Sequence, residues 1–307
     1  MKHIFVLNPV AGKGNADSLI LPEIIKEVKG LGIDYEIHRT INVGEATNYV
    51  SKKCKQNSDE NIRFYAIGGD GTLNEVANGA VGHHNAEIAF IPAGTGNDFA
   101  RVFTNYKYFN DINRQLNGIA KPIDLIKCND NYIVNMLNIG LDCDAALKAA
   151  YFKNNTFLRG QLAYIAGVLT VFVANKGSEL TISLENGEKH VGEFTLVAIG
   201  NGAFCGGGFK GVPKAKLDDG LLDVSIIRKV SRRTFVAMIN EYRKGTHLDH
   251  PDPEGIFSYI QCKNLNIKTN KETMICADGN QIFSNELSIS IQPNAIKFSV
   301  PEGCESN

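Results

Sequence analysis

The 307-residue sequence has no excess of charge of one sign, because 32 lysines and arginines balance 33 aspartates and glutamates. A protein whose main partner is nucleic acid needs a basic surface to neutralise phosphates, and this composition does not supply one. We therefore expect no nucleic-acid partner. Four basic residues suit either a small local patch or a solvated helix start: Arg228, Lys229, Arg232 and Arg233.

Long apolar runs are also missing. The run that comes nearest to a membrane span, residues 162–174, has 13 residues, whereas about 20 are needed to cross a bilayer. We expect no transmembrane segment. The run suits a buried helix or, together with Phe152, Phe157 and Leu158, the lining of a cleft for an acyl chain, and the sequence leaves both open.

No Cys-x-x-Cys pair occurs among the seven cysteines. An odd number of unpaired cysteines is typical of reduced thiols in a cytosolic protein. The N-terminus enters an apolar, strand-like run at once, without the basic segment and apolar core of a signal peptide. The sequence therefore predicts a cytoplasmic protein.

Glycine, by contrast, is concentrated in three turns, at 8–14, 68–72 and 92–98, each of which follows a short apolar run. Glycine lets backbone N–H groups approach a phosphate without a Cβ in the way, and a helix that begins after the turn adds its partial positive end. The turn at 68–72 is the most specific, because Asp70 and Thr72 could meet Mg²⁺ and phosphate together. A nucleoside triphosphate is the expected ligand.

Strands and helices alternate in the first part of the chain. The patterns predict strands at 3–7, 33–37, 62–67 and 87–91 and helices at 19–31, 45–55 and 73–80. Such alternation is typical of a parallel sheet that binds ligands at the carboxyl ends of its strands, where all three turns fall.

After about residue 121 the pattern changes. Predicted strands lie at 194–199, 221–227, 265–268 and 287–291, with one helix at 232–243. A chain of this length is expected to form two domains. We expect an α/β N-terminal domain at 1–125, joined by the last strand at about 293–307, and a mainly antiparallel C-terminal domain at 126–292.

The turns together resemble one family. The segments 8–14 (NPVAGKG), 69–79 (GDGTLNEVANG) and 94–101 (GTGNDFAR) are similar, in this order, to the diacylglycerol kinase catalytic-domain family, which includes bacterial lipid kinases and sphingosine kinases. Further on, 206–224 resembles the second-domain signature and 278–279 the final motif. The resemblance spans nearly the whole chain and implies a β-sandwich for the C-terminal domain.

The resemblance implies an ATP-dependent lipid kinase that transfers the γ-phosphoryl group to a hydroxyl of diacylglycerol or a similar lipid, with ATP and Mg²⁺ as cofactors. The lipid substrate would lie at a membrane surface that the protein meets transiently and peripherally, and a homodimer stays open. Asp70 would hold the Mg²⁺. The residues assigned to the nucleotide are Asn8, Gly12, Lys13, Gly14, Thr40, Gly69, Gly71, Thr72, Glu75, Thr95, Gly96, Asn97 and Asp98.

Other interpretations stay open for parts of this set. Asp98 could serve as a helix N-cap. The segment 216–221 resembles a second ion site, formed by the Asp219 carboxylate with the backbone carbonyls of Lys216 and Leu221, although Asp-Asp-Gly is also a common tight turn. NAD kinase shares the Gly-Gly-Asp-Gly turn and is a second alternative for the function.

One position departs from the family pattern. The final motif of the family is Asp-Gly-Glu, and its glutamate is the proposed base, whereas this chain has Asn280 after Asp278 and Gly279. An amide cannot accept the proton, and a general base contributes roughly a hundred- to ten-thousand-fold in rate. The catalytic candidates are Asp70, Asp278 and Asn280. If no carboxylate substitutes, the protein is a weak or silent nucleotide- and lipid-binding regulator.

Two histidines are the remaining candidates for chemistry. His247 and His250 stand beside prolines and have no cysteine or glutamate at metal-ligand spacing. We expect both to be solvated loop residues.

Overall fold

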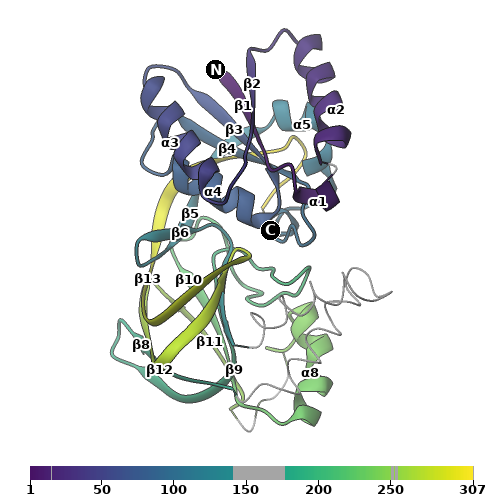
Figure 1. The fold of residues 1–307 in the computed structure, drawn as a ribbon. Helices are drawn as coiled ribbons and strands as arrows, with labels where there is room; N and C mark the ends of the chain where they lie inside the picture. Colours follow the sequence, from purple (N-terminus) through teal and green to yellow (C-terminus); the bar gives the residue numbers. More distant parts are fainter. Residues whose placement is uncertain (15, 141–176, 250–251, 253–254, 307) are drawn as a thin grey trace. The chain divides into compact units, whose positions relative to one another are not determined.

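The structure is a computed structural model, and it describes the chain except residues 15, 141–176, 250–251, 253–254 and 307 (Figure 1). The apolar run at 162–174 and the aromatic residues before it lie outside the described residues. The chain divides into two compact units. Unit 1 comprises Met1–Leu125, Leu217–Asp219 and Gln292–Asn307, and unit 2 comprises Ile126–Lys216 and Gly220–Ile291.

Unit 1 contains a parallel sheet whose strands run in the order β13-β4-β3-β1-β2. Every residue of β3 is buried, as expected for a parallel sheet with both faces covered. The strands are β1 (Lys2–Leu7), β2 (Tyr35–Arg39), β3 (Ile62–Gly68), β4 (Ala86–Pro92) and the part of β13 (Asn280–Val300) that includes Lys297 and Phe298.

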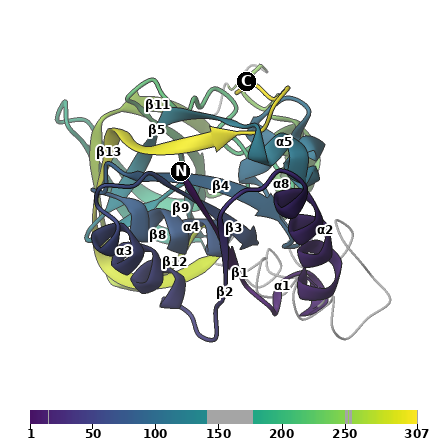
Figure 2. The same ribbon diagram turned by 90° about the horizontal axis from the view of Figure 1, so that it is seen from above.

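Helices cover both faces of this sheet (Figure 2). Apolar side chains of α2 and α5 pack on β1, β3 and β4, while α3 packs on α4, which lies against β3 and β4. The helical elements are α1 (Ala11–Gly14), α2 (Ala16–Gly30), α3 (Glu45–Gln56), α4 (Asp70–Ala80), η1 (Phe99–Val102), η2 (Tyr106–Asn110) and α5 (Ile112–Leu116). The predicted alternation of strand and helix is confirmed.

The second strand begins two residues later than the pattern predicts. Ile33 donates its N–H to the Val28 carbonyl at 3.0 Å, and Gly32 has a φ of 64°. This is a left-handed turn that closes the C-terminus of α2. Ile33 therefore belongs to the turn that ends α2, and β2 starts at Tyr35.

An aromatic cluster joins the end of the chain to unit 1. The Phe298 ring, which is fully buried, lies 5.0 Å from the ring of Phe99 and 5.7 Å from that of Phe103. Thr104 and Glu305 are linked by backbone and side-chain hydrogen bonds. The last strand thus completes both the sheet and the core of unit 1.

Unit 2 is built from antiparallel pairs in the order β11-β10-β9-β7-β12-β13, and β8 pairs with β9 and β12. The mainly antiparallel character predicted for this part is confirmed. The remaining strands are β5 (Ile119–Cys128), β6 (Asn131–Ile133), β7 (Met136–Gly140), β8 (Ser178–Leu184), β9 (Lys189–Gly200), β10 (Leu222–Arg228), β11 (Phe257–Cys262) and β12 (Asn264–Ala277).

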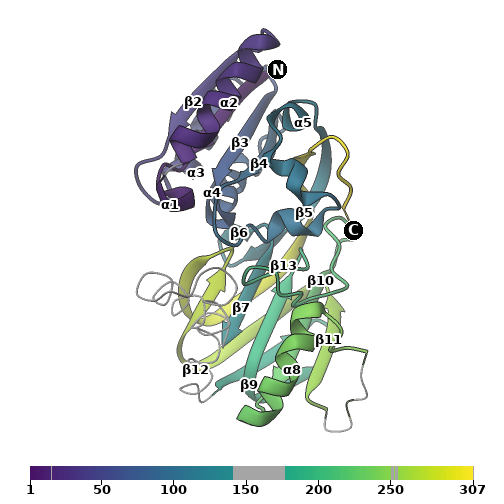
Figure 3. The same ribbon diagram turned by 90° about the vertical axis from the view of Figure 1, so that its right-hand side faces the viewer.

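Helix α8 (Arg232–Lys244) agrees closely with the predicted helix at 232–243 (Figure 3). The Ser231 hydroxyl accepts a hydrogen bond from the Thr234 N–H at 3.2 Å, which caps the first turn. Gly245, with a φ of 76°, ends the helix in the left-handed conformation.

The expectation that His247 is a solvated loop residue is wrong. Its side chain is only 1% exposed, and its ring lies 5.0 Å from Tyr242 and 5.4 Å from Phe257. Burial lowers the pKa of His247 to about 4. The Gly245 turn directs the chain back onto the sheet of unit 2, which no local composition signal indicates; His250 lies outside the described residues.

The cysteines among the described residues are free thiols, most of them buried. No helix in the described ranges combines the length and apolar character that a membrane span requires.

Candidate functional site

The three glycine turns leave adjacent strands of unit 1, because β4, β3 and β1 are neighbours. Leu7 pairs with Ile67, and Gly68 pairs with Pro92. The turns are also hydrogen-bonded across the strand ends: the Asn8 N–H donates to the Ile67 carbonyl at 2.9 Å, and the Ala93 N–H donates to the Gly68 carbonyl at 2.7 Å. The carboxyl edge of the sheet therefore gathers the turns, as parallel topology requires.

Asn8 connects the first turn to helix α4. Its Oδ1 accepts the Val10 N–H at 3.2 Å, and its Nδ2 donates to the Thr72 hydroxyl at 3.3 Å. Gly12 and Gly14 have φ angles of 62° and 77°, which L side chains rarely adopt. The Lys13 side chain lies outside the described part of the chain.

Thr40 follows the edge strand β2. Its backbone N–H and its hydroxyl both donate to the Leu7 carbonyl, at 2.9 and 3.3 Å. Thr40 is thereby held at the end of β1, next to the first glycine turn.

Asp70 is the first residue of α4 and bridges the second and third turns. Its carboxylate accepts the N–H of Asp98 at 3.2 Å and that of Phe99 at 3.1 Å. Burial raises the pKa of Asp70, and the N–H donors act in the opposite direction. A carboxylate held by fixed donors at a helix N-terminus has a defined position and a stabilised negative charge.

Close backbone approach explains why these turns need glycine. A Cβ on Gly94 would lie 2.5 Å from the Gly69 Cα, and a Cβ on Gly68 would lie 2.2 Å from the Thr72 hydroxyl oxygen. A Cβ on Gly96 would lie 3.3 Å from an Asp70 carboxylate oxygen. A side chain at Gly94 would force the second and third turns apart, and one at Gly68 would displace the Thr72 side chain.

The third turn is fixed by Asn97, which has a φ of 51°. Its side-chain amide exchanges two hydrogen bonds of 3.0 Å with the backbone of Gly94. Asp98 precedes η1, but its side chain makes no capping hydrogen bond. Its Oδ1 instead lies 3.3 Å from the Arg101 guanidinium, which also donates to the Gly96 carbonyl. Arg101 thus stabilises the third turn, a role that its place at the end of the motif 94–101 does not by itself predict.

Three further residues predicted to bind the nucleotide are Gly71, Glu75 and Thr95. Gly71 lies in the first turn of α4, and Glu75 follows about one turn later, where its carbonyl accepts the Thr47 hydroxyl at 2.9 Å. Thr95 is at the exposed tip of the third turn. The structure thus joins the second and third turns through Asp70, with Thr95 at the exposed tip of the third turn.

In unit 2, Asp278 and Gly279 form a two-residue hairpin loop between β12 and β13. Their φ angles are 46° and 84°, the combination of a type I′ turn, for which Asp-Gly is a preferred pair. The buried Asp278 carboxylate accepts the N–H groups of Val134, Asn135 and Met136 at 2.7–3.2 Å. Asp278 thereby holds the hairpin against the start of β7.

Asn280 is the first residue of β13 and pairs with Ala277 across this hairpin. Its side chain is partly exposed. It has a fixed backbone position in unit 2, but its side chain is an amide and brings no carboxylate to this point.

The candidate ion segment at Lys216, Asp219 and Leu221 lies in the stretch between Ala215 and β10. The Asp219 side chain is exposed, and the neighbouring Leu217 carbonyl accepts the Asp124 N–H at 2.7 Å. Asp124 itself, which sequence patterns did not single out, is buried and accepts the Asn294 N–H at 2.7 Å. Within the described ranges no group of three or more His, Cys, Asp or Glu side chains is arranged to hold a metal.

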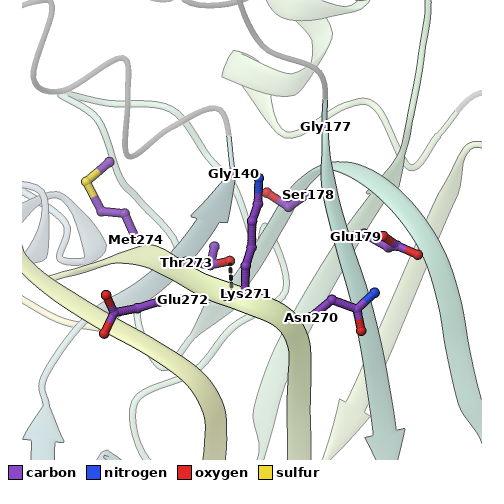
Figure 4. A pocket seen from close by; sticks show the side chains of 9 residues that line it. All are labelled: Gly140, Gly177, Ser178, Glu179, Asn270, Lys271, Glu272, Thr273 and Met274. Carbon is purple, nitrogen blue, oxygen red and sulfur yellow. Dashed lines mark hydrogen bonds between the residues drawn. The ribbon is translucent and has the colours of Figure 1, made fainter.

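A cavity of about 550 Å³ lies at another place in unit 2 (Figure 4). None of the predicted site residues lines it. Exposed polar groups such as Glu179, Lys271 and Glu272 dominate the lining, and Gly140 and Gly177 border the undescribed segment.

Two family models match nearly the whole chain. The diacylglycerol kinase catalytic domain matches residues 2–128, and the YegS C-terminal NAD kinase beta sandwich-like domain matches residues 135–300. The chain therefore belongs to the diacylglycerol kinase catalytic-domain family, in its form with a YegS-type C-terminal domain. This agrees with the family resemblance of the three glycine turns.

Individual relatives are distant but extend over the same length. The chain is 28% identical to a "Probable lipid kinase YegS-like" protein of Alcanivorax borkumensis, over 94% of each chain. It is 26% identical to the diacylglycerol kinase of Bacillus subtilis, over 89% of this chain and 88% of that one. A solved structure of a diacylglycerol kinase from Bacillus anthracis is similar in fold, with a TM-score of 0.69, 23% identity and coverage of 98% and 97%.

Proposed function

We propose that the protein is an ATP-dependent lipid kinase that transfers the γ-phosphoryl group to a hydroxyl of diacylglycerol or a similar lipid. The observation that carries this proposal is the arrangement at the carboxyl edge of unit 1, where Asn8 and Thr72 link the first glycine turn to the second and Asp70 links the second to the third. Phosphoryl transfer depends mainly on positioning and charge neutralisation, which such turns provide. The names of its relatives support the lipid as acceptor.

The residues of this edge suggest a division of roles. The N–H groups of the glycine turns, together with Asn8 and Thr40, would contact ATP. Mg²⁺ would neutralise the phosphate oxygens, and Asp70 would hold it. The backbone N–H groups of Asp98 and Phe99 hold the Asp70 carboxylate in a defined position, and carboxylate oxygens are ligands that a hard cation such as Mg²⁺ prefers. A nearby cation would also favour the ionised form of Asp70.

The residues at the expected position of the proton acceptor support a second candidate function. Asn280 replaces the family glutamate, and the Asp278 carboxylate is already used by three backbone donors. A protein that binds ATP and lipid without efficient transfer, acting as a regulator, is therefore the alternative.

The test is incubation with γ-labelled ATP and a panel of acceptors that includes diacylglycerol, a sphingoid base and NAD, followed by chromatography of the products. The wild-type protein should label a lipid, and Asp70→Asn should lose at least about a hundredfold of that rate. Asp130→Asn, at an exposed turn of unit 2, serves as the control. Calorimetric binding of Mg²⁺·ATP without any labelled lipid would instead support the regulator, and labelled NAD would support NAD kinase.

We also propose Asp219 as a ligand of a second, structural ion, with the carbonyls of Lys216 and Leu221. An ion that binds only the folded state raises stability by mass action. Without nucleotide, millimolar Mg²⁺ should raise the melting temperature of the wild-type protein and not that of Asp219→Ala. An equal response of both proteins would exclude this site.

A further inference from the structure

Asn135 lies in unit 2 between β6 and β7, and it is buried, with 4% of its surface exposed. The function proposed above gives it no role, and no sequence pattern singles it out. Its hydrogen bonds nevertheless join two segments that are far apart along the chain.

The first of these segments is the hairpin that carries Asn280. The N–H groups of Val134, Asn135 and Met136 all donate to the Asp278 carboxylate, at 2.7–3.2 Å. Successive backbone N–H groups that converge on one anion form a concave binding site. The backbone around Asn135 is therefore the site that holds this hairpin in place.

The second segment begins after β9. The Asn135 carbonyl accepts the N–H groups of Asn201 and Gly202, at 2.9 and 3.0 Å. The Asn135 side chain reaches further, because its Nδ2 donates to the Phe204 carbonyl at 2.9 Å. Phe204 begins a loop, residues 204–209, and Asn135 anchors this end of it.

The tip of the 204–209 loop is made of three glycines, at 206–208, whose φ angles are 58°, 81° and 110°. Cys205 and Phe209 close the tip by exchanging two backbone hydrogen bonds of 2.8 Å. Beyond it, the Lys210 N–H donates to the Arg243 carbonyl of α8 at 3.1 Å. Since glycine leaves the backbone of the tip many alternatives, the position of the loop depends on these anchors.

The amide of Asn135 is not explained by stability alone. Among the residues that the structure describes, its Oδ1 accepts no hydrogen bond. An unbonded amide oxygen in the interior costs free energy. The side chain is therefore better explained by the position in which its Nδ2 holds Phe204.

We propose that Asn135 is a positioning residue, which couples the 204–209 loop to the hairpin of Asp278 and thereby sets the position of residue 280. A shift of the loop would move the backbone that holds the Asp278 carboxylate, and residue 280 would move with the hairpin. The importance of residue 280 for transfer to the acceptor hydroxyl rests on the proposed function.

The coupling can be measured without any activity. The sequence contains no tryptophan, so Phe204→Trp places a unique fluorescent reporter in the loop. It keeps an aromatic ring near the Lys210 ammonium, which lies 5.8 Å from the centroid of the Phe204 ring. In this background, Asn135→Ala should raise the acrylamide quenching constant about twofold or more, because the backbone at position 204 loses its side-chain donor.

Asp278→Asn tests the coupling from the other end. It makes no change in the loop, but coupling between two sites is reciprocal, so it should raise the quenching constant in the same direction. Asn85→Ala is the matched control, since Asn85 is an equally buried amide of unit 1 that donates to backbone carbonyls; it should leave the constant unchanged. A response to Asn135→Ala without a response to Asp278→Asn, or no response to either, would overturn the proposal.

The effect on residue 280 is measured by a double-mutant cycle in the lipid-labelling assay. The gain in kcat produced by Asn280→Glu should shrink about ten- to a hundredfold when Asn135→Ala is also present, because a small misplacement of a reacting group is costly. The KM for ATP should not change, since the proposed ATP contacts belong to unit 1. An equal gain with and without Asn135→Ala, or lipid labelling with no gain from Asn280→Glu, would overturn the proposal.

These outcomes separate positioning from the proposed function. If no variant labels a lipid, the proposed function fails, and the quenching measurements alone decide whether Asn135 couples the two segments. If a lipid is labelled while quenching shows no coupling, the proposed function stands and the positioning role fails. Thermal unfolding of each variant verifies that it is folded.

Discussion

Position 280 is where this chain differs chemically from the Asp-Gly-Glu motif that the family resemblance implies. The pairing of Asn280 with Ala277 and the turn formed by Asp278 and Gly279 hold this position in the hairpin. A carboxylate side chain introduced at position 280 would extend from the same backbone position as the Asn280 amide.

Asn280→Glu should therefore raise lipid phosphorylation about ten- to a thousandfold, because it restores a general base, provided that no other carboxylate serves. The measurement is the labelling rate with saturating ATP. Asn280→Gln has the same length without the carboxylate and should stay at the wild-type rate. If Glu and Gln behave alike, the missing proton acceptor does not limit this protein.

Asp278 is expected to act on stability. Asn tolerates the left-handed conformation, so Asp278→Asn keeps the turn and replaces one acceptor oxygen by an NH₂ group that faces backbone donors. We expect a loss of about 2–4 kcal/mol in the free energy of unfolding, measured by urea denaturation, and little change for the exposed Asp130→Asn. Full stability with lost activity would mean that Asp278 takes part in the reaction itself.

At the scale of elements, the packing of the second glycine turn against the third requires a close approach of their backbones. A Cβ at position 94 would lie 2.5 Å from the Gly69 Cα, and backbone atoms cannot move aside as a flexible side chain can. The second and third turns are therefore coupled by sterics as well as by Asp70.

Gly94→Ala should weaken ATP binding by at least about tenfold and destabilise the protein by about 1–3 kcal/mol, since the two turns must separate. Calorimetry and thermal unfolding measure the two effects. Gly30→Ala is the matched control, because a Cβ there meets nothing within 4 Å and alanine favours the helix. Normal ATP binding by Gly94→Ala would show that the nucleotide does not use this junction.

Hydrophobic patterning predicted most elements, because short apolar runs that end at glycine are the buried strands of a parallel sheet. It misplaced the start of β2, where Ile33 is used by the turn after α2. Residue roles that depend on distant partners were not predictable. The donors to Asp278 lie more than 140 residues away along the chain, and His247 is buried only because the turn after α8 returns it to the sheet.

At the scale of the whole molecule, two buried histidines contribute to the loss of stability in acid. Burial lowers the pKa of both His3 and His247 from 6.5 to about 4. Below about pH 6.5 the unfolded chain therefore binds protons that the folded protein does not bind until about pH 4. The free energy of unfolding consequently decreases as the pH is lowered through this range.

His247→Phe should reduce the loss of stability between pH 7 and pH 5 by up to about 2 kcal/mol, because the aromatic ring is kept and the titration is removed. Urea denaturation at pH 7 and pH 5 provides the comparison, and the exposed His84→Gln should lose stability as the wild type does. An identical difference between the two pH values in His247→Phe and wild type would show that burial of His247 does not contribute.

The return of the last strand to unit 1 has a consequence for synthesis on the ribosome. Residues 1–125 emerge long before Phe298, whose ring fills the aromatic cluster with Phe99 and Phe103. Until then the sheet has an open edge at β4, where Lys297 and Phe298 later pair. Unpaired strand edges invite pairing with other chains. The edge of β4 therefore stays unpaired until the residues between 125 and 297 have been synthesised.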